Sequence, residues 1–104
     1  MSPVTPQPFS RERDFQRAVC QLAKTLGCIV YHTHDSRRSE PGFPDLVIVG
    51  KRAFMFRELK TERGYVSDAQ KEWLDKLADA KADAAVWRPS DWPVRITHEL
   101  RSIA

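Results

Sequence analysis

The sequence predicts an α/β domain in which a small mixed sheet of about four strands is flanked by helices. Segments with helical apolar spacing alternate with short apolar runs of strand length, and turn residues separate them. The 104 residues leave room for one domain with a modest core and not for two. The predicted helices cover residues 11–26, 67–80 and 96–103, and the predicted strands cover residues 28–33, 46–49, 53–60 and 84–88.

The N-terminal residues and the composition bear on where the protein works. Residues 1–8 contain three prolines and no periodicity, so we expect residues 1–9 to form a flexible arm before a domain of residues 10–104. They lack the basic and apolar regions of a signal peptide, and no apolar run reaches the length of a membrane span, so we expect a cytoplasmic protein without a membrane partner. A net charge of +3 suits an anionic partner.

The first predicted helix is amphipathic. Apolar residues recur at helical spacing from Phe15 to Leu26, and we expect Ser10 to cap the helix and Gly27 to end it. Glu12 lies one turn before Phe15, at the edge of the apolar stripe. One explanation is that its carboxylate favours the positive helix N-terminus or pairs with a neighbouring arginine.

The next strands carry the polar residues of greatest interest. The first, at residues 28–33, is rich in β-branched and aromatic residues. Residues 46–49 are continuously apolar, as in a strand buried on both sides, and Gly50 opens a tight connection to residues 53–60. Such a hairpin brings Glu58 back beside Asp45.

Two carboxylates brought together in a small domain repel each other and are costly to desolvate unless a cation lies between them. A hard divalent cation such as Mg²⁺ fits this requirement, because it prefers oxygen ligands and keeps positions for water and phosphate. Lys60 shares a strand face with Glu58 and would stabilise charge that develops during phosphodiester cleavage. A solvated strand edge is the alternative, but Gly42 and Pro44 beside strongly apolar runs favour a built site.

These residues resemble a known pattern. Pro44-Asp45 followed by Glu58-Leu59-Lys60 is similar to the PD-(D/E)XK nuclease superfamily, and within it to minimal stand-alone members of the VRR-NUC family, the virus-type replication-repair nucleases. Further matching segments, in order along the chain, are residues 12–16, 31–32, 42–45, 70 and 88–89.

The resemblance implies a restriction-endonuclease-like core and a structure-specific DNA endonuclease dependent on Mg²⁺ or Mn²⁺. It further implies a homodimer similar to Holliday junction resolvases, acting on branched DNA without an organic cofactor, in a bacterium or a phage-infected cell. A monomeric nuclease acting on flaps or single strands, a non-catalytic DNA-binding module, and a structural domain are the alternatives. A chain this short has little surface for reading bases, which favours recognition of DNA structure over sequence.

The resemblance also assigns roles to residues. It implies that Asp45, Glu58 and Glu12 hold the metal together with Leu59, and that Lys60 assists deprotonation of the attacking water or neutralises the transition state. Gln70 would position Lys60 or the water. The pattern Ser67-Asp68-Ala69-Gln70 is also a capping box, and the two roles of Gln70 can coexist.

Basic residues near this site are candidates for contacts with DNA. Arg37 and Arg38 lie in the polar loop that leads into the second strand, and their guanidinium groups match phosphate oxygens, although the loop can also be an ordinary solvated turn. His32 would line the site or the DNA groove. A zinc site at His32 and His34 is disfavoured, because no further cluster completes four ligands. Arg88 suits either a phosphate contact or a surface ion pair.

Two further features concern packing. Arg57 occupies a position where the family usually has an apolar residue, so we expect this face of the strand to be partly open or Arg57 to pair with an acid. Cys20 and Cys28 are widely spaced and lack a Cys-x-x-Cys pattern, so we expect reduced core thiols.

Overall fold

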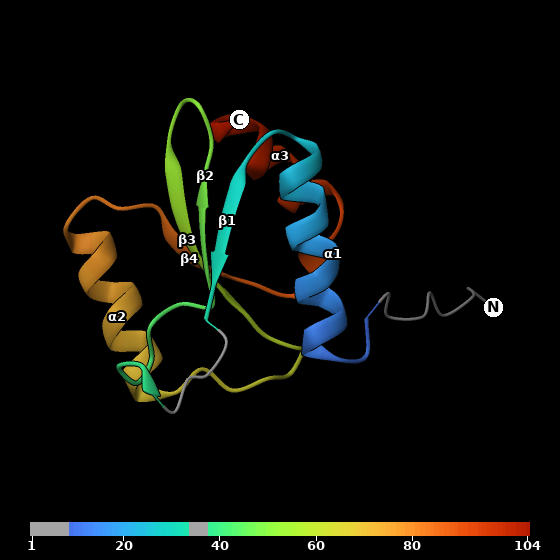
Figure 1. The fold of residues 1–104 in the computed structure, drawn as a ribbon. Helices are drawn as coiled ribbons and strands as arrows, with labels where there is room; N and C mark the ends of the chain where they lie inside the picture. The colour runs from blue at the N-terminus through green and yellow to red at the C-terminus, as the bar shows by residue number, and fades with distance from the viewer. Residues whose placement is uncertain (1–8, 34–37) are drawn as a thin grey trace.

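The computed structural model describes residues 9–33 and 38–104, and it has the mixed α/β architecture that the sequence predicts (Figure 1). Most of the predicted arm lies outside the described residues. Phe9 at its end packs against Phe15 and Trp92, with ring centroids 5.4 Å away in each case. The elements are α1 (Glu12–Thr25), β1 (Ile29–His32), β2 (Leu46–Val49), β3 (Phe54–Leu59), α2 (Asp68–Asp79), β4 (Ala84–Trp87), the short 3₁₀ helix η2 (Pro89–Asp91) and α3 (Val94–Ile103).

The four strands form one sheet in the order β1-β2-β3-β4. β1 and β2 are antiparallel, β2 and β3 are antiparallel, and β3 and β4 are parallel, so the sheet is mixed as predicted. In the β2–β3 hairpin, Leu46 lies opposite Arg57. This register places Asp45, just before β2, beside Glu58, as the sequence predicts.

The core lies between one face of the sheet and the helices α1 and α3. Alternate residues of the strands point to this face, as the pleat of a strand requires, and the apolar stripes of both helices cover them. The other face is covered less completely, because no residue of α2 is fully buried. The main core side chains are Phe15, Val19, Ala23, Leu46, Ile48, Met55, Leu59, Trp87, Ile96, Leu100 and Ile103.

The helix ends agree with the sequence in two of three cases. Gly27 follows α1 with a φ of +90°, a conformation that glycine adopts without strain. The capping box of α2 is present, because Ser67 Oγ accepts from the Gln70 N–H and Gln70 Oε1 accepts from the Ser67 N–H. The prediction of Ser10 as the cap of α1 is wrong: the N-cap is Arg11, and its side chain makes no capping hydrogen bond.

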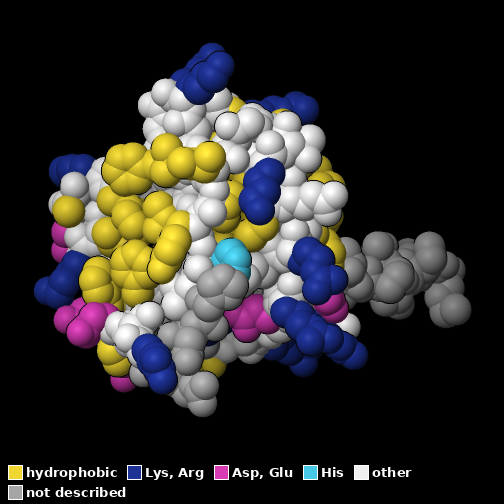
Figure 2. All heavy atoms as spheres, in the orientation of Figure 1, with side chains coloured by type: hydrophobic (Ala, Val, Ile, Leu, Met, Phe, Trp, Pro, Cys, Tyr) yellow, Lys and Arg dark blue, Asp and Glu magenta, His cyan; other side chains and the backbone are white. Residues whose placement is uncertain are grey.

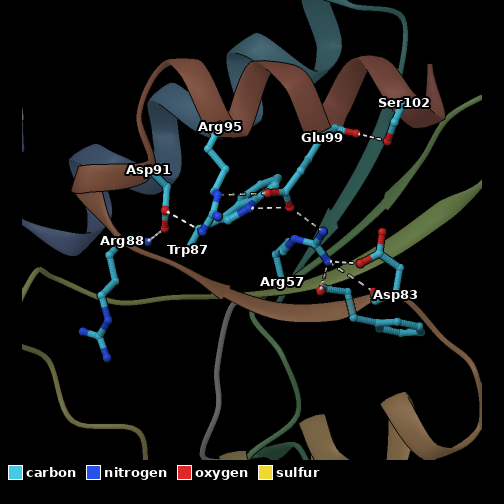
Figure 3. A network of polar contacts seen from close by, with 9 residues as sticks. Arg57, Asp83, Trp87, Arg88, Asp91, Arg95, Glu99 and Ser102 are labelled. Atoms are coloured by element: carbon cyan, nitrogen blue, oxygen red, sulfur yellow. Dashed lines mark hydrogen bonds and ion pairs between the residues drawn. The ribbon is translucent and has the colours of Figure 1, made fainter.

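Arg57 is buried on the core side of β3, with 2% of its surface exposed (Figure 3). Its Nη2 lies 2.8 Å from Glu99 Oε1, its Nη1 lies 2.8 Å from Asp83 Oδ1, and its guanidinium carbon lies 4.9 Å from the centroid of the Trp87 ring. The expected acidic partner is therefore confirmed. The alternative of a partly open face is wrong, because α3 closes this side of the sheet. Cys20 and Cys28 are both free, and Cys28 is buried.

Candidate functional site

Three carboxylates from separate parts of the chain meet at one end of the sheet. Glu12 is the first residue of α1, Asp45 immediately precedes β2, and Glu58 is the second-last residue of β3. One oxygen from each lies within 4.8 Å of the other two. Within residues 9–33 and 38–104, this is the one group of histidine, cysteine or acidic side chains with spacing suitable for a metal ion. The proposed zinc alternative includes His34, which lies outside the described residues.

The position of Asp45 is fixed from both sides. Its Oδ2 accepts a hydrogen bond of 2.8 Å from the backbone N–H of Leu59, which ties it to the end of β3. Upstream, Gly42 has a φ of +88° and lies directly against the backbone of Ala69 in the first turn of α2. A Cβ at Gly42 would collide with that backbone, including the Gln70 nitrogen at 2.8 Å, so only glycine permits this close approach.

Aromatic packing holds the same loop onto α2. The Phe43 ring makes edge contacts with Trp73 at 5.1 Å and with Phe56 at 6.1 Å between centroids. The Trp73 Nε1–H donates to the Pro41 carbonyl at 3.1 Å. These contacts connect the loop before Asp45 to both α2 and β3, and they limit how far the carboxylate can move.

Glu58 is the most deeply buried carboxylate, with 1% of its surface exposed. Its Oε2 has no hydrogen-bond partner among the described residues. Burial, followed by a hydrogen bond and charge repulsion from Asp45, raises the pKa of Glu58 to about 9, although Lys60 opposes this shift. Lys60 offsets only part of the cost of a buried carboxylate with an orphaned oxygen and two acidic neighbours, so the donor set fits a divalent cation with oxygen ligands.

Glu12 and Lys60 complete the electrostatics of the cluster. The pKa of the Glu12 carboxyl is raised by burial and then by the charge of Asp45, although much of the side chain is exposed. Lys60 follows β3, and its charge lowers the pKa of both Glu12 and Glu58. The ammonium group is therefore close enough to act on charge in the cluster.

A hollow of about 210 Å³ contains the three carboxylates and Gln70. Gln70 thus combines its capping bond with a place at the site. Leu59 has a fully buried apolar side chain, so it could contribute to a metal only through its backbone carbonyl. Further residues line the hollow that were not predicted as site residues, because they are not acidic or basic members of the motif or lie outside it, and only the fold brings them here. They include Thr33, Ser39, Glu40 and Phe43.

The residues predicted to bind DNA are placed differently from one another. Arg37 lies outside the described residues, and Arg38 is exposed. His32, at the end of β1, lines a second hollow beside α1. Arg88 forms no ion pair with any described residue. Its Nη1 donates to the carbonyls of residues 61, 62 and 64 at 2.8, 3.2 and 2.9 Å, so it holds the turn after β3. A phosphate contact by Arg88 would have to use its other nitrogens.

The comparisons with known proteins agree with this geometry. The family model of the VRR-NUC domain matches residues 4–91. A Fanconi-associated nuclease 1 homolog of Schizosaccharomyces pombe is 38% identical over 56 residues, which make up 52% of this chain and 8% of that protein. The chain therefore spans a small part of that relative's length.

The comparison with solved structures concerns the fold. A structure described as a VRR-NUC domain protein matches with a TM-score of 0.67 at 21% identity, covering 89% of each chain. The mixed sheet and its flanking helices are thus those of this nuclease fold. Within the described part of the chain, no helix combines the length and apolar character needed to span a membrane.

Proposed function

We propose that this chain, which belongs to the VRR-NUC domain family and so has a nuclease domain, is a divalent-metal-dependent DNA endonuclease that cleaves branched DNA. The observation that carries this proposal is the convergence of Glu12, Asp45 and Glu58 within 4.8 Å. A non-catalytic DNA-binding module would gain nothing from three mutually repelling carboxylates, one of them fully buried. We further propose that the enzyme acts in the cytoplasm, where it would meet its DNA.

The carboxylates and the backbone carbonyl of Leu59 would hold Mg²⁺ or Mn²⁺. When bound, such a cation would lower the pKa of water and polarise the scissile phosphate. The protein's own part is positional. The Leu59 N–H holds one oxygen of Asp45, and Asp45 offers a ligand oxygen to the cluster. Lys60 would neutralise charge on the phosphate as the bond breaks, and Gln70, fixed by its capping bond to Ser67, would orient the water or Lys60.

A second copy of the chain is the proposed partner, because the sheet face opposite the core presents an apolar row. Ile29, Val49 and Phe54 lie side by side across β1, β2 and β3, with Tyr31 beside them. Their exposed fractions are 70%, 39%, 52% and 63%. Figure 2 shows hydrophobic side chains gathered over the sheet and α2. A contiguous exposed apolar patch of this kind is typical of a protein–protein interface.

The catalytic proposal is tested with labelled four-way junction, flap, single-stranded and duplex DNA, in Mg²⁺, in Mn²⁺ and with a chelator. We expect paired, metal-dependent cuts across the junction by the wild type. Asp45→Ala and Lys60→Ala should each lower the cleavage rate by about 10²-fold or more, because the first removes a ligand of the metal and the second removes a cation at the reacting phosphate. Asp75→Ala removes an exposed carboxylate from α2 and serves as the matched control. Cleavage by Asp45→Ala at the wild-type rate would disprove the metal-site assignment.

The dimer is tested separately by light scattering after size exclusion. Phe54→Lys should convert a dimer to monomers and remove the pairing of the two cuts. Val94→Lys is the control, since Val94 is 79% exposed on α3 and lies outside the apolar row. A monomeric wild type that cuts flaps or single strands would replace the resolvase-like proposal with the monomeric one while leaving the active site unchanged.

A further inference from the structure

We propose that the groove between α1 and β1 is the path along which the DNA backbone reaches the carboxylate cluster. This inference rests on the proposed function and names the surface that would hold its substrate. The groove has a volume of about 710 Å³, and among the described residues its lining includes three basic side chains and no acidic one. Its lining includes the polar residues Arg13, Gln16, Arg17, Gln21, Lys24 and His32.

The spacing along α1 explains why these side chains share one surface. Arg13, Arg17 and Lys24 are separated by four and seven residues, so each lies within a fraction of a turn of the same helix face. The opposite face carries Phe15 and Val19, which are fully buried in the core. The basic stripe is therefore fixed in direction by the packing of the helix.

The charges of the stripe are not used by the fold. Among the described residues, no acidic side chain forms an ion pair with Arg13, Arg17 or Lys24, whereas Arg57 and Arg95 each have acidic partners. In Figure 2, Lys and Arg side chains follow the α1 side of the molecule, and acidic side chains lie near its lower end. Unpaired basic residues in a hollow attract a polyanion, and they do so without reading bases.

The groove borders the candidate active site at two places along the chain. At α1, Glu12 lines the hollow of the carboxylates, and its chain neighbour Arg13 lines the groove. At β1, Thr33 lines the hollow, and its neighbour His32 lines the groove. At both places, therefore, the two hollows are lined by residues that are adjacent in the chain. A strand that follows the groove would arrive at the cluster with its phosphates facing the carboxylates and Lys60.

The dimensions suit a short stretch of backbone. The rise along α1 from Arg13 to Lys24 is roughly 16 Å, which corresponds to about five phosphates of one B-form strand. Three cations over this length, with Gln16 and Gln21 as neutral donors between them, match the way proteins hold phosphates for positioning. The groove would add affinity and orientation, and it would leave the sequence of the DNA unread.

The test compares two triple variants that remove the same charge. The groove variant, Arg13→Gln/Arg17→Gln/Lys24→Gln, removes the three positive charges of the groove. The control variant, Lys51→Gln/Arg52→Gln/Arg101→Gln, removes three exposed cations near the β2–β3 turn and the C-terminus. Binding of a labelled four-way junction is measured in EDTA over a range of salt. The groove variant should lose roughly 10- to 100-fold in affinity near 0.1 M salt, and the slope of log K against log salt should fall by about 2 to 3. The control should change the slope by less than about 1.

Equal slopes in the two variants would overturn the path, because general attraction to a basic protein would then explain the binding. That result would leave the proposed function standing if Asp45→Ala still abolished cleavage. The groove variant could instead show the smaller slope of log K against log salt while Asp45→Ala cleaves DNA at the wild-type rate. That result would support the DNA path and reject the metal site.

Cys20 provides a probe of the groove that needs no substitution. It lies in the groove lining and is half-buried, whereas Cys28 is 4% exposed. Alkylation of Cys20 by a maleimide, followed by mass spectrometry, should slow at least about fivefold when the wild type is saturated with junction DNA in EDTA. An unchanged alkylation rate at saturation would exclude DNA from the groove.

Discussion

Arg57 and Glu58 are neighbours on β3 and are almost equally buried, but the charged groups around their side chains differ. The pleat points them to opposite faces of the sheet, with exposed fractions of 2% and 1%. Arg57 faces two carboxylates, a backbone carbonyl of Asp83 and the ring of Trp87 (Figure 3). Glu58 faces Asp45 and Glu12, which carry the same sign of charge as its own ionised form.

The difference in surroundings distinguishes a buried charge that stabilises the fold from a buried carboxylate that suits ligand binding. Burying an ion is costly, and a fold without function retains it only when partners within the chain compensate. Arg57 has such partners on α3 and before β4 for both of its Nη atoms, although its Nε has no hydrogen-bond partner among the described residues, so it is part of the structure. Glu58 has an unpartnered oxygen and a raised pKa, so its compensation has to come from a proton or from a bound cation. Two adjacent residues thus mark the structural and the functional face of one strand.

The largest expected effect on stability comes from removing the charge of Arg57. Arg57→Met should lower the free energy of unfolding by about 3 kcal/mol, because Glu99 and Asp83 lose their buried partner and the Trp87 ring loses its cation. Chemical denaturation followed by circular dichroism measures this change. Arg95→Met is the control: Arg95 is 70% exposed and lies 3.6 to 3.8 Å from its acidic partners, so its loss should cost less than about 1 kcal/mol. Equal effects in the two variants would mean that the Arg57 network adds no stability.

The next effect has the opposite sign. Glu58→Gln should stabilise the metal-free protein by about 2 kcal/mol near pH 8, because it removes a buried ionisable group without changing its shape. The pKa of Glu58 is raised in the folded state, so its contribution to stability is fully present below about pH 4.5 and is lost as the pH rises through about 9. Asp45, Glu12 and Lys60 are the charged groups that face it.

Denaturation at several pH values in EDTA checks this sign. The wild type should lose stability between pH 5 and pH 9, and the Glu58→Gln curve should be flatter, so that the two variants converge at low pH. Glu99→Gln is the matched control on the other face, and it should destabilise the protein at every pH by weakening the Arg57 network. A Glu58→Gln variant that is less stable than the wild type at pH 8 would contradict the contrast between the two faces.

Much of this arrangement could be predicted from local sequence patterns. The apolar run of residues 46–49 and the strand pattern after Gly50 predict the hairpin. The hairpin alone places Asp45 beside Glu58. Ser67 and Gln70 predicted the start of α2 because a capping box is a contact within four residues.

Contacts between distant segments could not be predicted in the same way. The partners of Arg57 lie 26 and 42 positions away, and no spacing rule connects such residues. The hollow likewise depends on the approach of Gly42 to α2, which only the assembled fold reveals. The sequence analysis considered only the apolar face of α1, although helical spacing applied to its basic residues would have indicated the groove.

A moderate effect is expected from metal ions, which would supply the missing partner of Glu58. Mn²⁺ at about 100 times its dissociation constant should raise the free energy of unfolding by about 2.7 kcal/mol at most, and a chelator should reverse the change. The gain should be greater at pH 8 than at pH 5.5, since carboxylates must be ionised to bind the cation. Thermal unfolding with and without Mn²⁺ measures this gain in stability, with Asp75→Ala as the control variant. A gain that persists in Glu58→Gln would place the cation elsewhere.

The smallest effect concerns Glu12, which separates the rigid part of the site from its outer edge. Asp45 and Glu58 are held by β2 and β3, whereas Glu12 is exposed in the first turn of α1, next to an N-cap that makes no side-chain hydrogen bond. An exposed carboxylate recovers most of its hydration when the metal is absent, so its removal changes little in the free protein. Glu12→Gln should therefore leave metal-free stability within about 0.5 kcal/mol of the wild type and reduce the Mn²⁺-induced gain without abolishing it. Complete loss of the gain would make Glu12 an equal ligand, and an unchanged gain would restrict the metal site to the two residues of the hairpin.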